Sequence, residues 1–254
     1  MPREWIYGRQ AVLAVLRAAR RPCHALLIAQ GTVAKGILGD IMGEAAARGC
    51  EVAYVPRSEI ARRTGAGGHQ GVALLTDAYP YLDEIDLLQR VEDAGEDALV
   101  LVLDHLQDPQ NVGNLLRTAE IAGVTVAVIP KRRAALVTPA VVNASAGAVE
   151  FLSVSLVTNL ARVVEMLQEA GMWVYALESA PQAPVFWDVD WTGPVGIIVG
   201  SEGEGVSRLL RERSDGVVRI PMWGKTSSLN AATAGALALY EVRRQRVAAK
   251  ARVG

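Results

Sequence analysis

Two apolar runs in the C-terminal part of the chain most constrain its fold. MWVYAL (172–177) and VGIIVG (195–200) lack the alternation of apolar and polar residues that marks a strand with one solvated face. Near-continuous apolar runs are typical of strands covered on both faces in a parallel sheet. LVLVL (99–103) and TVAVIP (125–130) also read as strands, and helical segments lie between the four runs. We therefore predict an α/β fold whose C-terminal part contains a parallel sheet.

Residues 1–80 predict a separate, smaller α/β domain. HALLIA (24–29), EVAYV (51–55) and GVALLT (71–76) read as strands, and helical segments accompany them. The loop before the last strand holds three glycines followed by His69, Gln70 and Gly71. Such a loop either forms a flexible turn or contacts bases or phosphates, and composition alone does not decide between the two.

Charge and composition limit the kinds of partner. The net charge of the 254 residues is −1, but acidic side chains concentrate in residues 81–97, which leaves residues 1–80 mildly basic. We predict an acidic linker at 81–97 between domains at 1–80 and 98–254. No apolar run reaches the length of a membrane span, and Cys23 and Cys50 have no CxxC spacing. The three histidines show no metal-ligand spacing. We expect a cytoplasmic protein without membrane or metal binding, whose N-terminal residues are no signal peptide.

Two glycine-containing loops resemble nucleotide-binding motifs only superficially. Gly224-Lys225-Thr226 looks like the end of a Walker-type phosphate-binding loop, but the required glycine five positions earlier is Arg219. The run Gly200 to Gly205 has the wrong glycine order for a dinucleotide fingerprint, which argues against an oxidoreductase. The second loop still places Glu202 after a buried strand, where its carboxylate suits pairing with an arginine such as Arg117.

Residues 108–123 predict a helix that packs on the sheet. Its apolar residues recur at helical spacing, and Asn111 is a suitable N-cap for a helix that begins at about Val112. Arg117 lies outside the apolar stripe. Its guanidinium is either a solvated charge or a functional cation, and periodicity leaves both interpretations open.

Three separated segments resemble the three motifs of the SpoU family of S-adenosylmethionine-dependent RNA ribose 2′-O-methyltransferases, part of the SPOUT superfamily. They are DPQNVGNLLRTA (108–119), IIVGSEGEGVS (197–207) and IPMWGKTSSLNAATAGALALYE (220–241), in the order of the family. EWIYGRQAVLAVLRA (4–18) and the His69-Gln70-Gly71 loop resemble the accessory RNA-binding domain of the rRNA-directed branch. The whole plan is most similar to bacterial enzymes that methylate a guanosine in the P-loop of the peptidyl-transferase centre of 23S rRNA.

The resemblance implies a fold, a co-substrate and a set of site residues. It implies a deep trefoil knot in residues 98–254, S-adenosylmethionine as methyl donor without a metal, and a homodimer that pairs through the knotted domain. Its implied site residues are Asn111, Arg117, Glu202, Ser228 and Asn230 for catalysis, Gly200, Ile220 and Leu229 for the cofactor, and His69, Gln70 and Gly71 for RNA. A tRNA ribose or an rRNA adenosine remains an alternative substrate. A non-catalytic RNA-binding protein of ribosome assembly is the alternative from another class.

Overall fold

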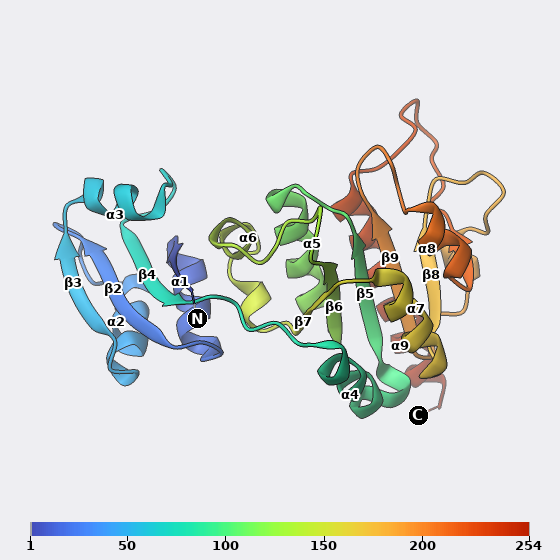
Figure 1. Cartoon of the computed structure of the whole chain (residues 1–254), viewed down its shortest axis with the longest axis horizontal. Helices are drawn as coiled ribbons and strands as arrows, with labels where there is room; N and C mark the ends of the chain where they lie inside the picture. Colours follow the sequence, from blue (N-terminus) through green and yellow to red (C-terminus); the bar gives the residue numbers. More distant parts are fainter. Residues whose placement is uncertain (1, 254) are drawn as a thin grey trace. The chain divides into compact units, whose positions relative to one another are not determined.

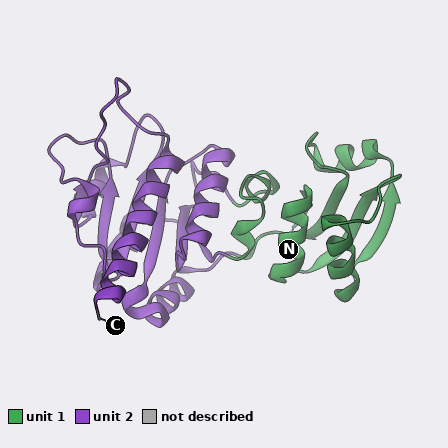
Figure 2. Cartoon of the chain, turned by 180° about the vertical axis from the view of Figure 1, so that it is seen from behind, with its two compact units in different colours: residues 1–80, 137–151 green, residues 81–136, 152–254 purple. Residues whose placement is uncertain are grey.

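A computed structural model describes residues 2–253, which fall into two compact units (Figures 1 and 2). Unit 1 comprises residues 1–80 and 137–151, and unit 2 comprises residues 81–136 and 152–254. Because unit 1 takes a segment from the middle of the chain, the backbone passes between the units at three places. No helix among the described residues is long and apolar enough to cross a membrane.

Unit 1 contains a four-stranded mixed sheet with the strand order β1-β4-β2-β3. Strands β2 and β3 are parallel, and β4 runs antiparallel to both β1 and β2. The edge strand β1 was not predicted, because its five residues carry no clear apolar alternation. The elements are β1 (Arg3–Tyr7), α1 (Arg9–Ala18), β2 (Cys23–Ala29), α2 (Ile37–Ala47), β3 (Glu51–Val55), α3 (Arg57–Thr64) and β4 (Val72–Asp77).

Residues 137–151 are part of unit 1. Helix α6 (Pro139–Ala144) packs on β1, and a 3₁₀ turn (Ala148–Glu150) packs on α1. Glu150 is 1% exposed and forms an ion pair with Arg21, which is 4% exposed and also pairs with Glu4 at 2.5 Å. Burial raises the pKa of Glu150, although the Arg21 guanidinium opposes this shift. A buried ion pair therefore ties this distant segment to the N-terminal part of the chain.

Unit 2 contains a six-stranded sheet with the order β10-β8-β9-β5-β6-β7, in which every neighbouring pair is parallel. The predicted parallel sheet is confirmed, and every residue of β5, β6 and β9 is buried. The elements are β5 (Leu99–Asp104), α5 (Pro109–Ile121), β6 (Val126–Pro130), β7 (Val154–Val157), α7 (Leu160–Glu169), β8 (Trp173–Leu177), β9 (Val195–Gly200), α8 (Arg208–Arg213), β10 (Gly216–Val218) and α9 (Ala231–Val253).

The acidic segment 81–97 packs on unit 2 as a helix. Helix α4 (Glu84–Ala94) begins after Asp83, whose carboxylate accepts hydrogen bonds from two backbone N–H groups of the first turn. Leu87 and Val91 are buried in the hydrophobic core of unit 2. The acidic side chains lie on the opposite, solvated face. One apolar side of this short helix therefore belongs to the core of unit 2. The acidic composition of the segment did not reveal this apolar side.

Helix α9 lies close against α5 and β9 because small residues line the contact. A Cβ atom on Gly235 would come within 2.7 Å of Leu115 Cδ1 and 3.1 Å of Val199 Cγ2. Ala238, one turn further along, is fully buried. Arg243 then reaches across to the C-terminal end of α5 and donates to the carbonyl oxygen of Gly123 at 2.6 Å. This cation stabilises the end of α5, where unpaired carbonyl groups concentrate.

Arg246 connects the second half of α9 to the amino-terminal edge of the sheet. Its side chain is 3% exposed although it carries a full charge. Among the residues that the structure describes, the guanidinium donates only to backbone carbonyl oxygens, which are those of Asp97 (2.6 Å), Gly193 (2.7 Å), Ala98 (2.9 Å) and Trp191 (3.3 Å).

We predict that Arg246→Met lowers the free energy of unfolding by about 2–3 kcal/mol, because the substitution leaves buried carbonyl groups without donors. The matched control is Arg244→Met, which removes only an exposed arginine paired with Glu241 and should change stability little. Urea unfolding followed by circular dichroism measures both variants. Equal stability of the two would show that the carbonyl cage around Arg246 contributes nothing.

Candidate active site

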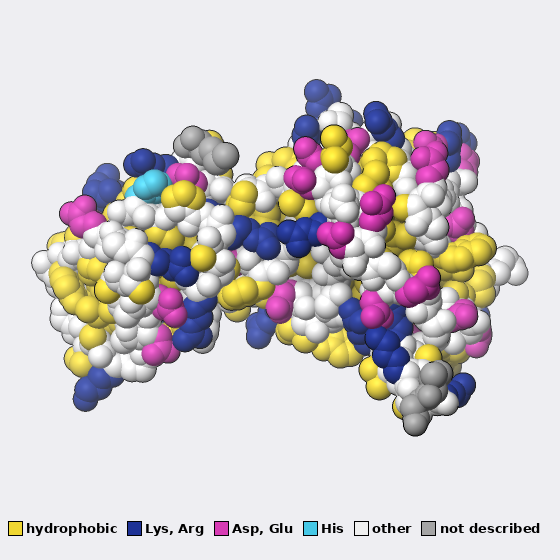
Figure 3. All heavy atoms as spheres, turned by 90° about the horizontal axis from the view of Figure 1, so that it is seen from below, with side chains coloured by type: hydrophobic (Ala, Val, Ile, Leu, Met, Phe, Trp, Pro, Cys, Tyr) yellow, Lys and Arg dark blue, Asp and Glu magenta, His cyan; other side chains and the backbone are white. Residues whose placement is uncertain are grey.

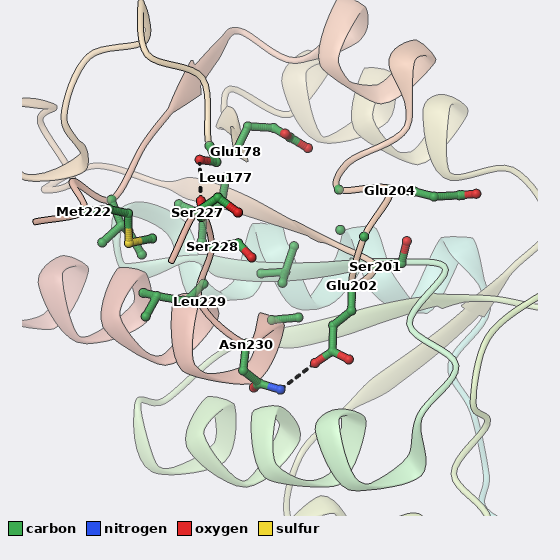
Figure 4. A pocket seen from close by; sticks show the side chains of 18 residues that line it. Leu177, Glu178, Ser201, Glu202, Glu204, Met222, Ser227, Ser228, Leu229 and Asn230 are labelled. Carbon is green, nitrogen blue, oxygen red and sulfur yellow. Dashed lines mark hydrogen bonds between the residues drawn. The ribbon is translucent and has the colours of Figure 1, made fainter. Parts of the chain in front are cut away.

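A cavity of about 600 Å³ opens at the carboxyl ends of β8 and β9 (Figure 4). The loop that follows each strand forms one wall, and the polar loop 221–230 before α9 forms another. Because parallel strands end at the same edge of a sheet, three distant segments converge here. The lining residues are Leu177, Glu178, Ser179, Val199, Gly200, Ser201, Glu202, Gly203, Glu204, Gly205, Ile220, Met222, Ser227, Ser228, Leu229, Asn230, Ala231 and Ala234.

A carboxylate and two amides form the polar cluster of this site. Glu202 Oε1 accepts hydrogen bonds from Asn111 Nδ2 at 2.7 Å and from Asn230 Nδ2 at 2.5 Å. The Asn230 Nδ2 group also donates to Asn111 Oδ1 at 2.8 Å. Each of the three predicted motifs therefore contributes one side chain to a single closed network. Charge-assisted hydrogen bonds of this kind hold the carboxylate in one orientation.

Helix caps position the two asparagines. Asn230 is the N-cap of α9, since its Oδ1 accepts from the backbone N–H groups of Ala232 and Thr233 at 3.0 and 3.2 Å. The prediction that Asn111 caps α5 is wrong. Asp108 is the cap and accepts from the backbone N–H of Asn111 at 3.0 Å. Pro109 occupies the first helical position, as is common at helix starts. Because Asp108 provides the cap, the Asn111 side chain is free to reach Glu202.

The predicted cofactor-binding residues lie together in the cavity wall. Gly200, Ile220 and Leu229 all line it, as does the predicted catalytic residue Ser228. Gly200 ends β9, and a Cβ atom there would overlap the backbone of Gly205. The strand can approach the loop this closely only because position 200 carries no side chain.

Arg117 stands apart from the cavity of its own chain. It follows Asn111 by six residues on α5, which places it about 9 Å along the axis and about 120° around it. Its side chain is exposed and makes no hydrogen bond or ion pair with any residue in the range 2–253. The expected ion pair between Arg117 and Glu202 is therefore absent from the described residues, and Oε1 of Glu202 accepts from the two amides instead.

Two further carboxylates shape the site and were missed by the sequence reasoning. Glu178 follows β8, lines the cavity and accepts from the backbone N–H of Val206. Asp104 ends β5, is 1% exposed and accepts from the backbone N–H of Ser207 at 2.6 Å. Together they fasten the end of the loop that carries Glu202. The available signal was an acidic residue directly after a buried parallel strand.

The residues predicted to contact RNA form a tight turn in unit 1. His69 is 6% exposed, and its Nδ1 accepts from the backbone N–H of Gly71 at 3.0 Å. Burial lowers the pKa of His69, and the nearby Arg57 acts in the same direction. Gln70 is exposed, has a φ of 53°, and its Oε1 accepts from the backbone N–H of Arg9 at 3.0 Å. Only Gln70 of the three thus presents its side chain to solvent.

Comparison with protein families identifies the family to which the chain belongs. Residues 98–240 match the SpoU rRNA Methylase family, and residues 5–82 match a domain described as RNA 2′-O ribose methyltransferase substrate binding. The chain belongs to the SpoU methyltransferase family. A putative TrmH family tRNA/rRNA methyltransferase of Bacillus subtilis is 39% identical over 243 residues, which cover 96% of both chains. The suspected resemblance is therefore confirmed, and the protein is an RNA methyltransferase of this family.

Solved structures extend the likeness to the fold. The SpoU methyltransferase AviRb of Streptomyces viridochromogenes, in complex with AdoMet, has a TM-score of 0.79 and 24% identity. It aligns with 97% of this chain, which covers 91% of that structure. An AdoMet-bound rRNA methyltransferase of Sinorhizobium meliloti has a TM-score of 0.79 and 23% identity, with 95% and 87% covered. The predicted fold class, a parallel-sheet α/β domain preceded by a small α/β domain, is therefore confirmed.

We predict that Asn230→Ala lowers stability by about 1 kcal/mol, the usual cost of a lost N-cap, and also reduces kcat at least about tenfold. Asn159→Ala is the matched control, because Asn159 caps α7 in the same way without lining the cavity. It should show a similar stability loss with an unchanged kcat. Thermal unfolding and methyl-transfer rates test both variants. A near-normal rate for Asn230→Ala would reduce Asn230 to a helix cap.

Proposed function

We propose that this chain transfers a methyl group from S-adenosylmethionine to a ribose 2′-hydroxyl of RNA, and that its target is a guanosine in the peptidyl-transferase P-loop of 23S rRNA. The observation that carries the chemistry is the network of Asn111, Glu202 and Asn230 at a cavity bounded by glycine-rich backbone. The reaction takes place in the cytoplasm, where rRNA is made and assembled.

The cavity suits S-adenosylmethionine in size and chemistry. Its volume of about 600 Å³ lies within the range of small-molecule sites. Leu177, Ile220 and Leu229 supply apolar surface for a flat base, and Glu178 and Glu204 supply carboxylates for cationic groups. The bound donor supplies an activated methyl group on a positively charged sulfur.

Glu202 is suited to orient the attacking hydroxyl. Its Oε1 takes both amide donors, and its Oε2 makes no hydrogen bond with any described residue. This second oxygen can accept a hydrogen bond from the ribose hydroxyl and position it for in-line attack. Ser228, exposed on the adjacent loop, can hold the same sugar. Arg117, always charged, stabilises the developing negative charge and an RNA phosphate and does not serve as a base.

The substrate-binding match at residues 5–82 supports recognition of structured RNA by unit 1. The turn at His69, Gln70 and Gly71 presents Gln70 beside Arg9, a pair suited to a base edge or a phosphate. Figure 3 shows Lys and Arg side chains mixed with Asp and Glu on the face drawn, so this face is neither uniformly positive nor uniformly negative. Recognition by shape and by local contacts fits this surface better than bulk attraction of charge.

An exposed apolar face on unit 2 supports a homodimer. Leu237 and Tyr240 on α9 are 44% and 52% exposed, and Ile121 on the adjacent α5 is 60% exposed. Arg117 lies on the exposed side of α5, one turn before Ile121. Exposed apolar surface of this kind is typical of protein interfaces. A second copy that covers this face would bring Arg117 to a subunit boundary.

Methyl transfer to defined RNAs tests the proposed function. The protein is incubated with S-adenosylmethionine labelled on the methyl group, together with unmodified 23S rRNA or unmodified tRNA. Nucleoside mass spectrometry then identifies the product, for which we expect 2′-O-methylguanosine in 23S rRNA. A ribose-methylated adenosine or a tRNA product would replace the target, and a methylated base would overturn the reaction. Absence of S-adenosylmethionine binding in calorimetry would favour a non-catalytic assembly protein.

A further inference from the structure

Two tryptophans form an exposed aromatic pair beside the cavity. Trp223 is 84% exposed and Trp187 is 43% exposed. Their ring centroids are 6.2 Å apart, and the ring planes are inclined by only 15°. Trp223 directly follows Met222, which lines the cavity. The pair therefore lies beside the part of the cavity wall that Met222 forms, and Trp223 exposes most of its surface to solvent.

The segments that carry both rings are fastened to each other. A parallel bridge joins Val185 to Arg219, and the backbone N–H of Phe186 donates to the carbonyl oxygen of Arg219 at 2.9 Å. Below Trp187, the carbonyl oxygen of Phe186 accepts from Nε1 of the fully buried Trp191 at 2.5 Å. These hydrogen bonds thus hold the backbone that carries Trp187 in place. An aromatic surface held in advance loses little conformational entropy when a ligand stacks on it.

The surroundings of the pair are polar and carry charges of both signs. Asp188 directly follows Trp187 and is exposed, whereas the charged residue near Trp223 in the sequence is Lys225. Gly224, Lys225, Thr226 and Ser227 follow Trp223, and all four are exposed. Lys225 makes no hydrogen bond or ion pair with any residue between 2 and 253. Charged residues, lysine among them, are depleted at the core of a protein interface. Aromatic rings beside an unpaired cation are instead the combination that holds single-stranded nucleic acid.

We propose that Trp223, supported by Trp187, is a stacking platform for an unpaired nucleobase of the RNA substrate, close in sequence to the methylated nucleotide. Lys225 contacts the adjoining phosphate. The inference rests on the proposed RNA methylation and adds a subsite to it. Access to a 2′-hydroxyl requires an unpaired, unstacked nucleotide, and an aromatic ring replaces the stacking that its neighbour loses.

Binding of short RNAs tests the platform without methyl transfer. The probes are fluorescein-labelled oligoadenylate and an abasic ribose-phosphate oligomer of equal length and charge, measured by fluorescence anisotropy. We expect Trp223→Ala to weaken oligoadenylate binding about tenfold, in line with the contribution of one stacked base. Binding of the abasic oligomer should not change, and Trp223→Phe should retain most of the affinity. The matched control is Trp173→Ala, since Trp173 is 60% exposed but begins β8, at the edge of the sheet opposite the cavity.

Several outcomes would overturn the platform. Equal affinity of the native protein for oligoadenylate and the abasic oligomer would show that no base stacks there. Loss of S-adenosylmethionine binding in Trp223→Ala would assign the ring to support of the cavity loop. A shift of the native mass from dimer to monomer in that variant would assign the pair to a subunit interface. Trp187→Ala should reproduce the selective loss. Because the assay needs no methyl donor, failure of the methylation proposal would leave its result interpretable.

Discussion

Gly200→Ala is expected to weaken S-adenosylmethionine binding more than about 100-fold. The reason is that steric overlap of the added Cβ atom should cost about 3 kcal/mol of binding free energy. A Cβ atom at this position would overlap the carbonyl group of Gly205 and the backbone nitrogen of Val206. Ser201 and Gly205 exchange backbone hydrogen bonds of 2.9 and 3.1 Å, so the loop cannot move away without breaking both. The displaced loop carries Glu202 and forms one wall of the cavity.

Calorimetric titration with S-adenosylmethionine measures this effect, and circular dichroism checks that the variant is folded. Gly193→Ala is the control, because an added Cβ there meets no atom within 4 Å and its φ is not in the left-handed region. It should bind the methyl donor like the native protein. Native-like binding by Gly200→Ala would mean that the loop rearranges freely and that Gly200 does not shape the cofactor site.

Features of the fold that leave a pattern in neighbouring residues could be predicted from the sequence. Features that depend on contacts between residues far apart in the chain could not. The run at 195–200 correctly predicted a parallel strand buried on both faces, because such burial leaves a local pattern. The run at 172–177 also forms a parallel strand, but its burial on both faces was wrongly predicted, since Trp173 is 60% exposed and Tyr175 is only partly buried. The start of α5 had a local signal that favoured Asp108, namely Pro109 at the first helical position, and the choice of Asn111 overlooked it. The place of residues 137–151 in unit 1 had no local signal, because Arg21 and Glu150 are 129 residues apart.

The candidate site shows the same division. Asn111 and Asn230 are 119 residues apart, and only the family resemblance brought them together before the structure showed their hydrogen bond. The pairing of Glu202 with Arg117 followed from charge alone and was wrong for the described residues, since Arg117 does not line the cavity of its own chain and two neutral amides donate to Glu202 Oε1. The aromatic pair of Trp187 and Trp223 was not predicted, because Trp187 lies in a three-residue 3₁₀ turn (Phe186–Asp188) and Trp223 in a loop, and neither segment has an apolar periodicity.

Arg117→Ala is expected to reduce kcat about 10²–10³-fold, the range seen when one group that stabilises developing charge is removed. S-adenosylmethionine affinity should remain within about twofold, because Arg117 does not line the cavity of its own chain and a side chain without ligand contact contributes little binding energy. Arg117→Lys should recover only part of the rate, since lysine keeps the charge but lacks the planar fork of donors. Unchanged turnover of Arg117→Ala would remove this residue from the reaction.

The position of Arg117 on the exposed face of α5 leads to a sharper test with mixed dimers. If Arg117 serves the cavity of a second copy, a dimer of one Arg117→Ala chain and one Glu202→Gln chain has one cavity with both native side chains. Random exchange of two inactive variants at equal amounts should then restore about a quarter of the native activity, because half of the dimers are mixed and each has one intact site. If Arg117 acts within its own chain, every cavity carries one substitution and the mixture stays inactive. Size-exclusion chromatography with light scattering confirms that the chains pair, so restored activity identifies a site completed by the second subunit.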